Sequence, residues 1–138
     1  MIEVTYFPEG DHETQRLEAK TDKQAVSDQA LWAGLNPGMR ILDVGCGPGI
    51  TTISLATAAQ PGGKAIGIDG SAERVEYAKT KYGNDDVGFE HRDFFSDLSD
   101  LGEFDFIWVR CVLEFYLTEA SRLVIHLSRS LKKGGIVC

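Results

Sequence analysis

Hydrophobic positions follow two different periods along this chain. Short, nearly continuous apolar runs predict strands that are buried on both faces, and apolar side chains spaced three or four residues apart predict the helices between them. Because strands and helices alternate, we expect an α/β fold with a parallel sheet and right-handed crossovers. The predicted strands are Arg40–Gly45, Lys64–Asp69, Val87–His91, Phe104–Arg110 and Gly135–Cys138.

Residues that favour helix ends bound the predicted helices, which cover 12–20, 21–35, 50–59, 72–82 and 118–133. Thr21 and Gln24 fit a capping box at the start of the second helix. Ser71 is the predicted N-cap of the fourth helix, and Gly134 is the expected end of the last. The packing face predicted for the second helix consists of Ala25, Leu31, Trp32 and Leu35.

The chain has 138 residues and 43% hydrophobic content, which suit one domain with its own core. We expect residues 1–35 to form an N-terminal helical segment and residues 36–138 to form the α/β unit. The chain has no long apolar run and no charged segment followed by an apolar one at its start, so we expect neither a membrane span nor a secretory signal. Three scattered cysteines do not suggest a disulfide framework, so we expect a cytoplasmic location and no membrane partner.

The charge of the chain bears on its partners. There are 21 acidic and 14 basic residues, which gives a net charge of −7. A protein that neutralises nucleic-acid phosphates usually carries a basic patch. We therefore expect no nucleic-acid partner.

Candidate chemistry gathers where the strand Arg40–Gly45 meets the following helix. The residues there read Leu42-Asp43-Val44-Gly45-Cys46-Gly47-Pro48-Gly49, with glycine at three alternate positions. Glycine allows a ligand to approach the backbone closely, and the start of a helix presents free N–H groups. The pattern therefore predicts a site for a nucleotide-like ligand.

The spacing of this motif narrows the ligand. A dinucleotide-binding turn reads G-x-G-x-x-G, but Ile50 occupies the sixth position here. Asp43 would repel the phosphates of a nicotinamide dinucleotide and would attract an ammonium group. The motif therefore favours a cationic nucleoside without phosphates, and a nicotinamide cofactor is the alternative.

The run from Leu42 to Gly49 resembles the first motif of class I S-adenosylmethionine-dependent methyltransferases. The resemblance covers about residues 36–138 and implies a doubly wound, Rossmann-like sheet with strand order 3-2-1-4-5. It also implies an N-terminal lid over the cofactor, for which Tyr6, His12 and Arg16 are candidate contacts. The family fold continues beyond the fifth strand, so we expect a truncated fold whose open edge is covered by a second copy or a partner.

The resemblance also implies roles for residues that follow other strands. Asp69 is expected to bind the ribose hydroxyls, because two carboxylate oxygens match a vicinal diol, although a role at the helix start is the alternative. Asp93 is the candidate partner of the adenine amino group, with His91 and Glu90 as alternatives. The expected cofactor contacts are Asp43, Gly45, Cys46, Gly47, Gly49, Asp69, Gly70, Ser71, Asp93, Phe94 and Arg110.

Methyl transfer from a sulfonium requires positioning and exclusion of water more than it requires a dedicated catalytic group. Residues 110–116 are expected to face the methyl group, with Glu114 as the candidate base and Cys111 as either a nucleophile or inert packing. This segment lacks the Asp/Asn-Pro-Pro-aromatic and Pro-Cys motifs of nucleic-acid methyltransferases. The expected activity is metal-independent transfer to a small-molecule acceptor, and the alternative is a binding module without turnover.

Overall fold

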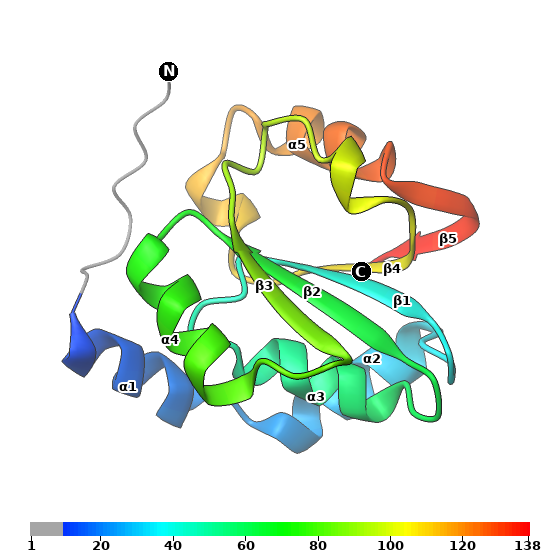
Figure 1. The fold of residues 1–138 in the computed structure, drawn as a ribbon. Helices are drawn as coiled ribbons and strands as arrows, with labels where there is room; N and C mark the ends of the chain where they lie inside the picture. The colour runs from blue at the N-terminus through cyan, green and yellow to red at the C-terminus, as the bar shows by residue number, and fades with distance from the viewer. Residues whose placement is uncertain (1–9) are drawn as a thin grey trace.

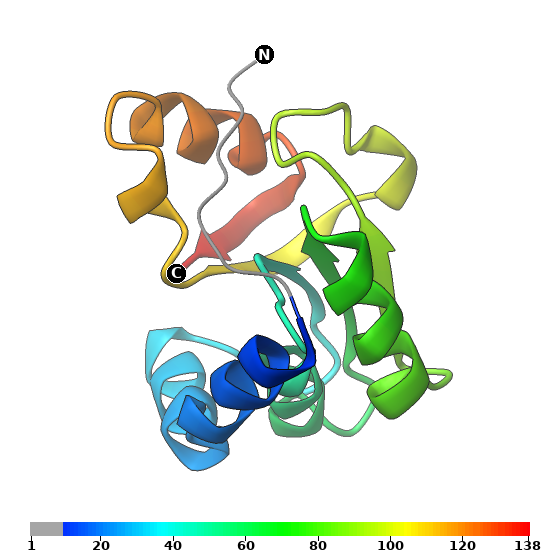
Figure 2. The ribbon, with the colours of Figure 1, turned by 90° about the vertical axis from the view of Figure 1, so that its left-hand side faces the viewer.

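The computed structural model describes residues 10–138 and contains five parallel strands in one sheet (Figures 1 and 2). The strand order is β3-β2-β1-β4-β5, which confirms the predicted doubly wound α/β fold. The strands are β1 (Arg40–Val44), β2 (Lys64–Asp69), β3 (Val87–His91), β4 (Phe104–Val109) and β5 (Leu131–Val137). The helices are α1 (Asp11–Lys20), α2 (Lys23–Ala33), α3 (Ile50–Ala58), α4 (Ala72–Tyr82) and α5 (Ala120–Ser128), with short 3₁₀ turns η1 (Ser99–Leu101) and η2 (Leu113–Phe115).

The sheet separates two apolar layers. Helices α2, α3 and α4 cover one face, and α5 with the segment around η1 covers the other (Figure 1). Strand β1 lies between β2 and β4, and its Ile41 and Leu42 are fully buried on opposite faces. This central position explains why Ile41, Leu42 and Val44 of β1 are all apolar, since a strand covered on both faces buries side chains on each of them. None of the helices in residues 10–138 has the length and apolar character that a bilayer span requires.

The packing face predicted for the second helix is wrong at Leu31 and Trp32, although the predicted Leu35 is buried just after α2. Trp32 is 91% exposed and Leu31 is half exposed, whereas Val26 and Ala30 are fully buried. Small side chains at these positions let α2 lie close against α3, and a tryptophan there would hold the two helices apart. The large apolar side chains of Leu31 and Trp32 therefore do not mark the buried face of α2.

The start of α2 also differs from the prediction. Asp22 is the N-cap, and its side chain accepts hydrogen bonds from the backbone N–H groups of Gln24 and Ala25. The Thr21 hydroxyl instead donates to the carbonyl of Leu17, at the end of α1. The residue after the predicted cap therefore takes its role, because Thr21 is engaged by the preceding helix.

The boundary between α5 and β5 lies earlier than predicted. Helix α5 ends at Ser128, and β5 begins at Leu131 rather than Gly135. Pairing with β4 is irregular, because Phe104 pairs with Leu131 and Phe106 pairs with Ile136. Gly134 adopts a φ of 81° within this irregular stretch. The glycine that was expected to end a helix thus accommodates extra residues in a strand.

Candidate cofactor-binding site

A cavity of about 520 Å³ lies between α1 and the carboxyl ends of β1, β2 and β4. This is where an open α/β sheet places ligands, because neighbouring crossovers leave the sheet in opposite directions between β1 and β4. The predicted site residues that line the cavity are Asp43, Gly45, Cys46, Gly47, Asp69, Arg110 and Glu114.

The three motif glycines all have positive φ angles, but their surroundings differ. A Cβ on Gly45 would lie 2.5 Å from Val112 Cγ2, and one on Gly49 would lie 2.9 Å from both Ala78 Cβ and Phe89 Cζ. A Cβ on Gly47 would meet nothing within 4 Å. Gly45 and Gly49 are therefore required by packing, and Gly47 presents open backbone beside the cavity.

Asp43 is a buried acid in the wall of the cavity, with 1% of its surface exposed. Its Oδ2 accepts a hydrogen bond of 2.7 Å from the Thr52 hydroxyl on α3. Burial raises the pKa of Asp43 to about 7, opposed by the Thr52 hydrogen bond. The nearby charge of Asp69 also raises this pKa, and Arg110 lowers it. A cationic ligand would favour the ionised form of such a carboxyl.

Asp69 joins the glycine loop to the start of α4. Its Oδ2 accepts the Gly47 N–H at 2.9 Å, and its Oδ1 accepts the Ser71 N–H at 2.8 Å. Burial raises the pKa of Asp69, although the two backbone N–H groups act in the opposite direction. Ser71 itself is the N-cap of α4, as predicted, since its side chain accepts from the Arg74 N–H. The Asp69 side chain therefore both organises the loop and lines the cavity.

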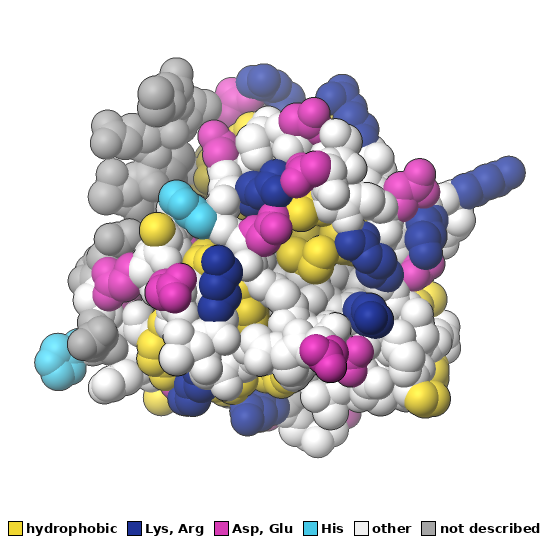
Figure 3. Space-filling view, in the orientation of Figure 1, with side chains coloured by type: hydrophobic (Ala, Val, Ile, Leu, Met, Phe, Trp, Pro, Cys, Tyr) yellow, Lys and Arg dark blue, Asp and Glu magenta, His cyan; other side chains and the backbone are white. Residues whose placement is uncertain are grey.

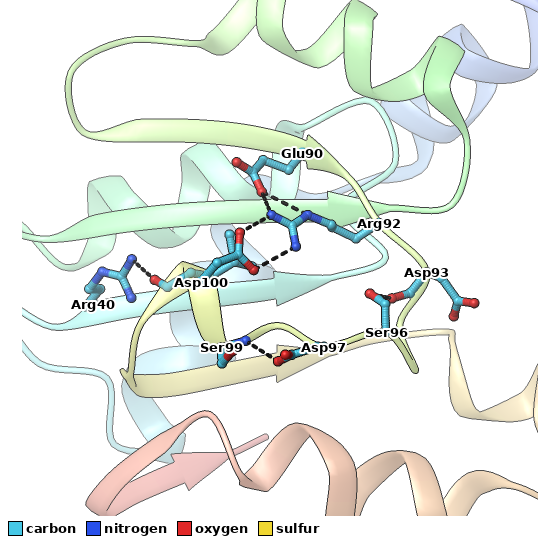
Figure 4. Close-up of polar contacts among 9 residues, drawn as sticks. Arg40, Glu90, Arg92, Asp93, Ser96, Asp97, Ser99 and Asp100 are labelled. Carbon is cyan, nitrogen blue, oxygen red and sulfur yellow. Dashed lines mark hydrogen bonds and ion pairs between the residues drawn. The ribbon is translucent and has the colours of Figure 1, made fainter.

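The other predicted contacts, Gly49, Gly70, Ser71, Asp93 and Phe94, do not line this cavity. Phe94 is 2% exposed and packs in the layer on the α5 side of the sheet. Asp93 Oδ1 accepts the Phe95 N–H, and Figure 4 shows its side chain apart from the neighbouring ion pairs.

Both alternatives to Asp93 are engaged locally. The Arg92 guanidinium lies between Glu90 and Asp100 and forms ion pairs with both, at 2.7 and 2.5 Å (Figure 4). His91 Nε2 lies 3.0 Å from the carbonyl oxygen of Gly70. The adenine contact of Asp93 therefore stays a prediction.

Helix α1 supplies cavity residues that the sequence indicated only in part. Arg16 lines the cavity, His12 does not, and Tyr6 lies outside the described residues. Leu17, Lys20 and Thr21 also line it, on the helical face shared with Arg16. Their spacing of one, four and five residues from Arg16 is the signal that could have identified them.

The remaining wall comes from tertiary packing. Trp108 on β4 lines the cavity beside its register partner Asp43, and its Nε1 is buried without a hydrogen-bond partner among the described residues. Cys111, after β4, has a φ of 55° and is exposed. No three His, Cys, Asp or Glu side chains within residues 10–138 are placed to hold a metal ion.

A family model described as a methyltransferase domain matches residues 35–138. The chain belongs to the S-adenosylmethionine-dependent methyltransferase family. This confirms the resemblance drawn from the glycine motif, and the strand order agrees with the Rossmann-like fold of that family.

Curated relatives of this methyltransferase domain include ribosomal protein L11 methyltransferase of Thermosipho africanus, which is 34% identical over 95% of this chain and 45% of its own length. A 23S rRNA (uracil(1939)-C(5))-methyltransferase of Shewanella sediminis is 32% identical over 61% of this chain and 19% of its own length. The chain thus spans less than half the length of these relatives. Their names give a protein and an RNA as acceptors.

A similar solved structure is a SAM-dependent methyltransferase from Geobacter sulfurreducens in complex with S-adenosyl-L-homocysteine. It is 28% identical, with a TM-score of 0.67, over 83% of this chain and 46% of that chain. The methyltransferase fold is therefore shared with a protein solved with the demethylated cofactor.

Proposed function

We propose that this methyltransferase domain binds S-adenosylmethionine in the cavity at the carboxyl ends of β1, β2 and β4 and transfers its methyl group to a small-molecule acceptor. The observation that carries the proposal is the meeting of Asp43, Asp69 and the open backbone of Gly47 at one cavity. These groups match an ammonium group, a vicinal diol and a ligand that approaches the main chain closely.

In this proposal the cofactor lies along the glycine loop. The buried Asp43 attracts its ammonium group, and Arg110 attracts its carboxylate. Asp69 accepts hydrogen bonds from the ribose, since each of its oxygens has a second lone pair beyond the one used by Gly47 or Ser71. The further proposed contacts are Gly45, Cys46 and Gly49 along the loop, and Gly70, Ser71, Asp93 and Phe94 beyond β2 and β3.

The transfer step is an in-line displacement. A lone pair of the acceptor atom forms a bond to the methyl carbon, the S–CH₃ bond breaks, and its electron pair stays on sulfur to give neutral S-adenosylhomocysteine. A protonated acceptor gives its proton to Glu114, which lines the cavity and is exposed, or to water. The cavity walls hold the two reactants together and exclude solvent between them.

A small acceptor fits the charge of the molecule better than RNA does. The chain has a net charge of −7, and on the face shown in Figure 3 basic and acidic side chains are interspersed. An RNA-binding surface would gather Lys and Arg over an extended area.

Calorimetric titration with S-adenosylhomocysteine tests the cofactor site. We expect saturable binding, no binding of NADH, and an affinity at least about tenfold weaker in Asp69→Ala, because several hydrogen bonds to the ligand are lost. Asp97→Asn is the matched control, because Asp97 is exposed and bonds locally to Ser99. Thermal unfolding of each variant separates loss of binding from loss of folding. Absence of binding by the folded wild-type chain would refute the proposal.

A second candidate function is a cofactor-binding module without turnover of its own. The lengths of the relatives favour this function, because the chain matches only 45% of the L11 methyltransferase and 19% of the rRNA enzyme. The two functions differ in one measurement. A module binds S-adenosylhomocysteine but releases none from S-adenosylmethionine with any acceptor tested, whereas the enzyme releases it with its own acceptor.

A further inference from the structure

Helix α1 is fastened to α4 by one carboxylate that meets three donors. Glu18 accepts hydrogen bonds from the Tyr77 hydroxyl at 2.8 Å, from the Lys81 amino group at 2.6 Å and from the Tyr82 hydroxyl. Tyr77, Lys81 and Tyr82 all lie on α4, near its carboxyl end. Three donors converging on one acid fix the rotation of α1 about its own axis as well as its position.

This rotation directs one face of α1 toward the cavity. Arg16, Leu17, Lys20 and Thr21 line the cavity, whereas Glu18 lies on another side of the helix. The Arg16 guanidinium forms a bidentate ion pair with the Glu13 carboxylate, with 2.8 Å between Nε and Oε2. Glu13 therefore balances part of the charge of Arg16. Lys20 has no hydrogen bond or ion pair with any described residue. The tethered helix therefore holds against the cavity a cation that pairs with nothing in residues 10–138.

Three of the charged side chains that line the cavity are buried: Asp43, Asp69 and Arg74 are 1%, 4% and 5% exposed, and Arg74 lowers the pKa of Asp69. Lys20 and Arg110 are exposed cations. Arg110 is close enough to Asp43 to lower the pKa of that carboxyl, whereas Lys20 is an exposed residue at the carboxyl end of α1. Arg110 therefore lies near the buried acids, and Lys20 lies on the part of the cavity wall that α1 forms.

Comparing the cations of the cavity with the charged groups of S-adenosylmethionine shows which cation is left for the methyl acceptor. S-adenosylmethionine carries a single carboxylate, which Arg110 satisfies in the arrangement proposed above. Two further cations line the cavity, but Arg16 is paired with Glu13 and Arg74 lies near Asp69. Lys20 has no counterpart on the cofactor, whose remaining charged groups are an ammonium and a sulfonium. Lys20 therefore favours a negatively charged group on the methyl acceptor, which occupies the space beside the cofactor.

We propose that the methyl acceptor of this chain is a small molecule bearing an anionic group, and that Lys20, assisted by Arg16, binds that group. The inference rests on the proposed function, because it assigns the rest of the cavity to S-adenosylmethionine. In a chain of net charge −7, an anion is repelled by most of the surface, and a cationic cavity wall directs it to the reacting centre.

The test compares two probes of nearly equal shape that differ in charge, benzoate and benzamide. Each is titrated into the full 138-residue chain saturated with S-adenosylhomocysteine, and binding is followed by the backbone amide signals of residues 16–21 and 110–115 in ¹⁵N–¹H NMR spectra. We expect benzoate to bind at least about threefold more tightly than benzamide, which is the effect of one charge pair at an exposed lysine. We expect Lys20→Gln to abolish this preference, and Lys23→Gln, on the exposed start of α2, to keep it.

Several results of these titrations would contradict the binding of an anionic acceptor by Lys20. Equal binding of the two probes, no shift of these signals by benzoate up to its solubility limit, or an unchanged preference in Lys20→Gln would overturn the inference. So would a Lys20→Gln variant that loses S-adenosylhomocysteine affinity instead, because Lys20 would then serve the cofactor. Salt-sensitive binding of a short RNA to the same residues without binding of benzoate would assign the cations to nucleic acid. Failure of S-adenosylhomocysteine itself to bind would refute the proposed function, a result seen before either probe is added.

Discussion

At the scale of single residues, Asp43 unites the stability and the proposed function of the domain. The residue lies on β1, is 1% exposed and lines the cavity, with Thr52 of α3 as its hydrogen-bond partner. Its pKa of about 7 means that the protein holds a carboxyl that is half ionised at neutral pH. Burying this carboxylate is unfavourable for the protein alone, but a cationic ligand would supply the counter-charge that the site lacks.

Cofactor affinity should rise with pH through neutrality. The ammonium group of S-adenosylhomocysteine favours ionised Asp43, and the ionised fraction increases as the pH passes the pKa of about 7. Calorimetry at pH 6 and pH 8 should show binding about tenfold tighter at the higher pH. Asp43→Asn should bind weakly and without this pH dependence, and an equal slope in that variant would contradict the role of Asp43.

The stability of the unliganded chain should change with pH in the opposite direction. The pKa of Asp43 is higher in the folded state than its ordinary value near 4, so the folded state binds the proton more tightly. The free energy of unfolding should therefore fall as the pH rises from about 4 through 7. At pH 8, Asp43→Asn should raise it by about 1–3 kcal/mol in urea unfolding, because a buried charge is removed. A less stable variant at that pH would be the contrary result.

The motif glycines should differ in their tolerance of a methyl group. Gly49→Ala places a Cβ against Ala78 and Phe89, so it should lower the free energy of unfolding by about 2–5 kcal/mol. Gly47→Ala meets open space and should cost about 1 kcal/mol through its positive φ, but it should weaken S-adenosylhomocysteine binding. Unfolding curves and calorimetry on both variants check this, and equal stability losses would contradict it.

At the scale of elements, the sequence predicted those features that adjacent residues determine. The bounds of β2, β3 and α4 agree with the prediction, because apolar runs mark the two strands and Ser71 and Gly83 mark the ends of the helix. The buried face of α2 and the start of β5 were missed, because each depends on a partner element: α3 selects small residues, and β4 imposes an irregular register.

Substitutions on α2 test its corrected orientation. Trp32→Ser should change the free energy of unfolding by no more than about 0.5 kcal/mol, since the side chain is 91% exposed. Val26→Ala should lower it by about 1–3 kcal/mol, because a fully buried side chain leaves a cavity. Urea unfolding would show the reverse order if Trp32 packed against the domain as its apolar character suggested.

At the scale of the whole molecule, the cavity is formed by segments that are distant in sequence. The glycine loop and Asp69 could be predicted, because their spacing along the chain reflects one crossover of the sheet. Trp108 could not, since β4 reaches the cavity only through its packing on β1. Lys20 could be inferred only from its helical spacing to Arg16, because α1 reaches the cavity through its packing on α4.

Ligand binding should stabilise this whole assembly. S-adenosylhomocysteine at about 100 times its Kd should raise the free energy of unfolding by about 2.7 kcal/mol, if it binds the folded chain alone. The gain at a fixed ligand concentration should be larger at pH 8 than at pH 6, because Asp43 is then ionised. Urea midpoints with and without ligand measure it, and a gain that falls with pH would contradict the assignment.

The contacts of Asp69 bear on how fast the domain can take up its ligand. Both carboxylate oxygens accept hydrogen bonds from main-chain N–H groups, so the protein's own contacts define the shape of the bottom of the cavity. Preorganisation of this kind removes loop ordering from the binding step and leaves diffusion and the passage past α1 to set the association rate. The speed of capture would then be governed by the helix at the entrance, whereas the lifetime of the complex would depend on the two buried acids.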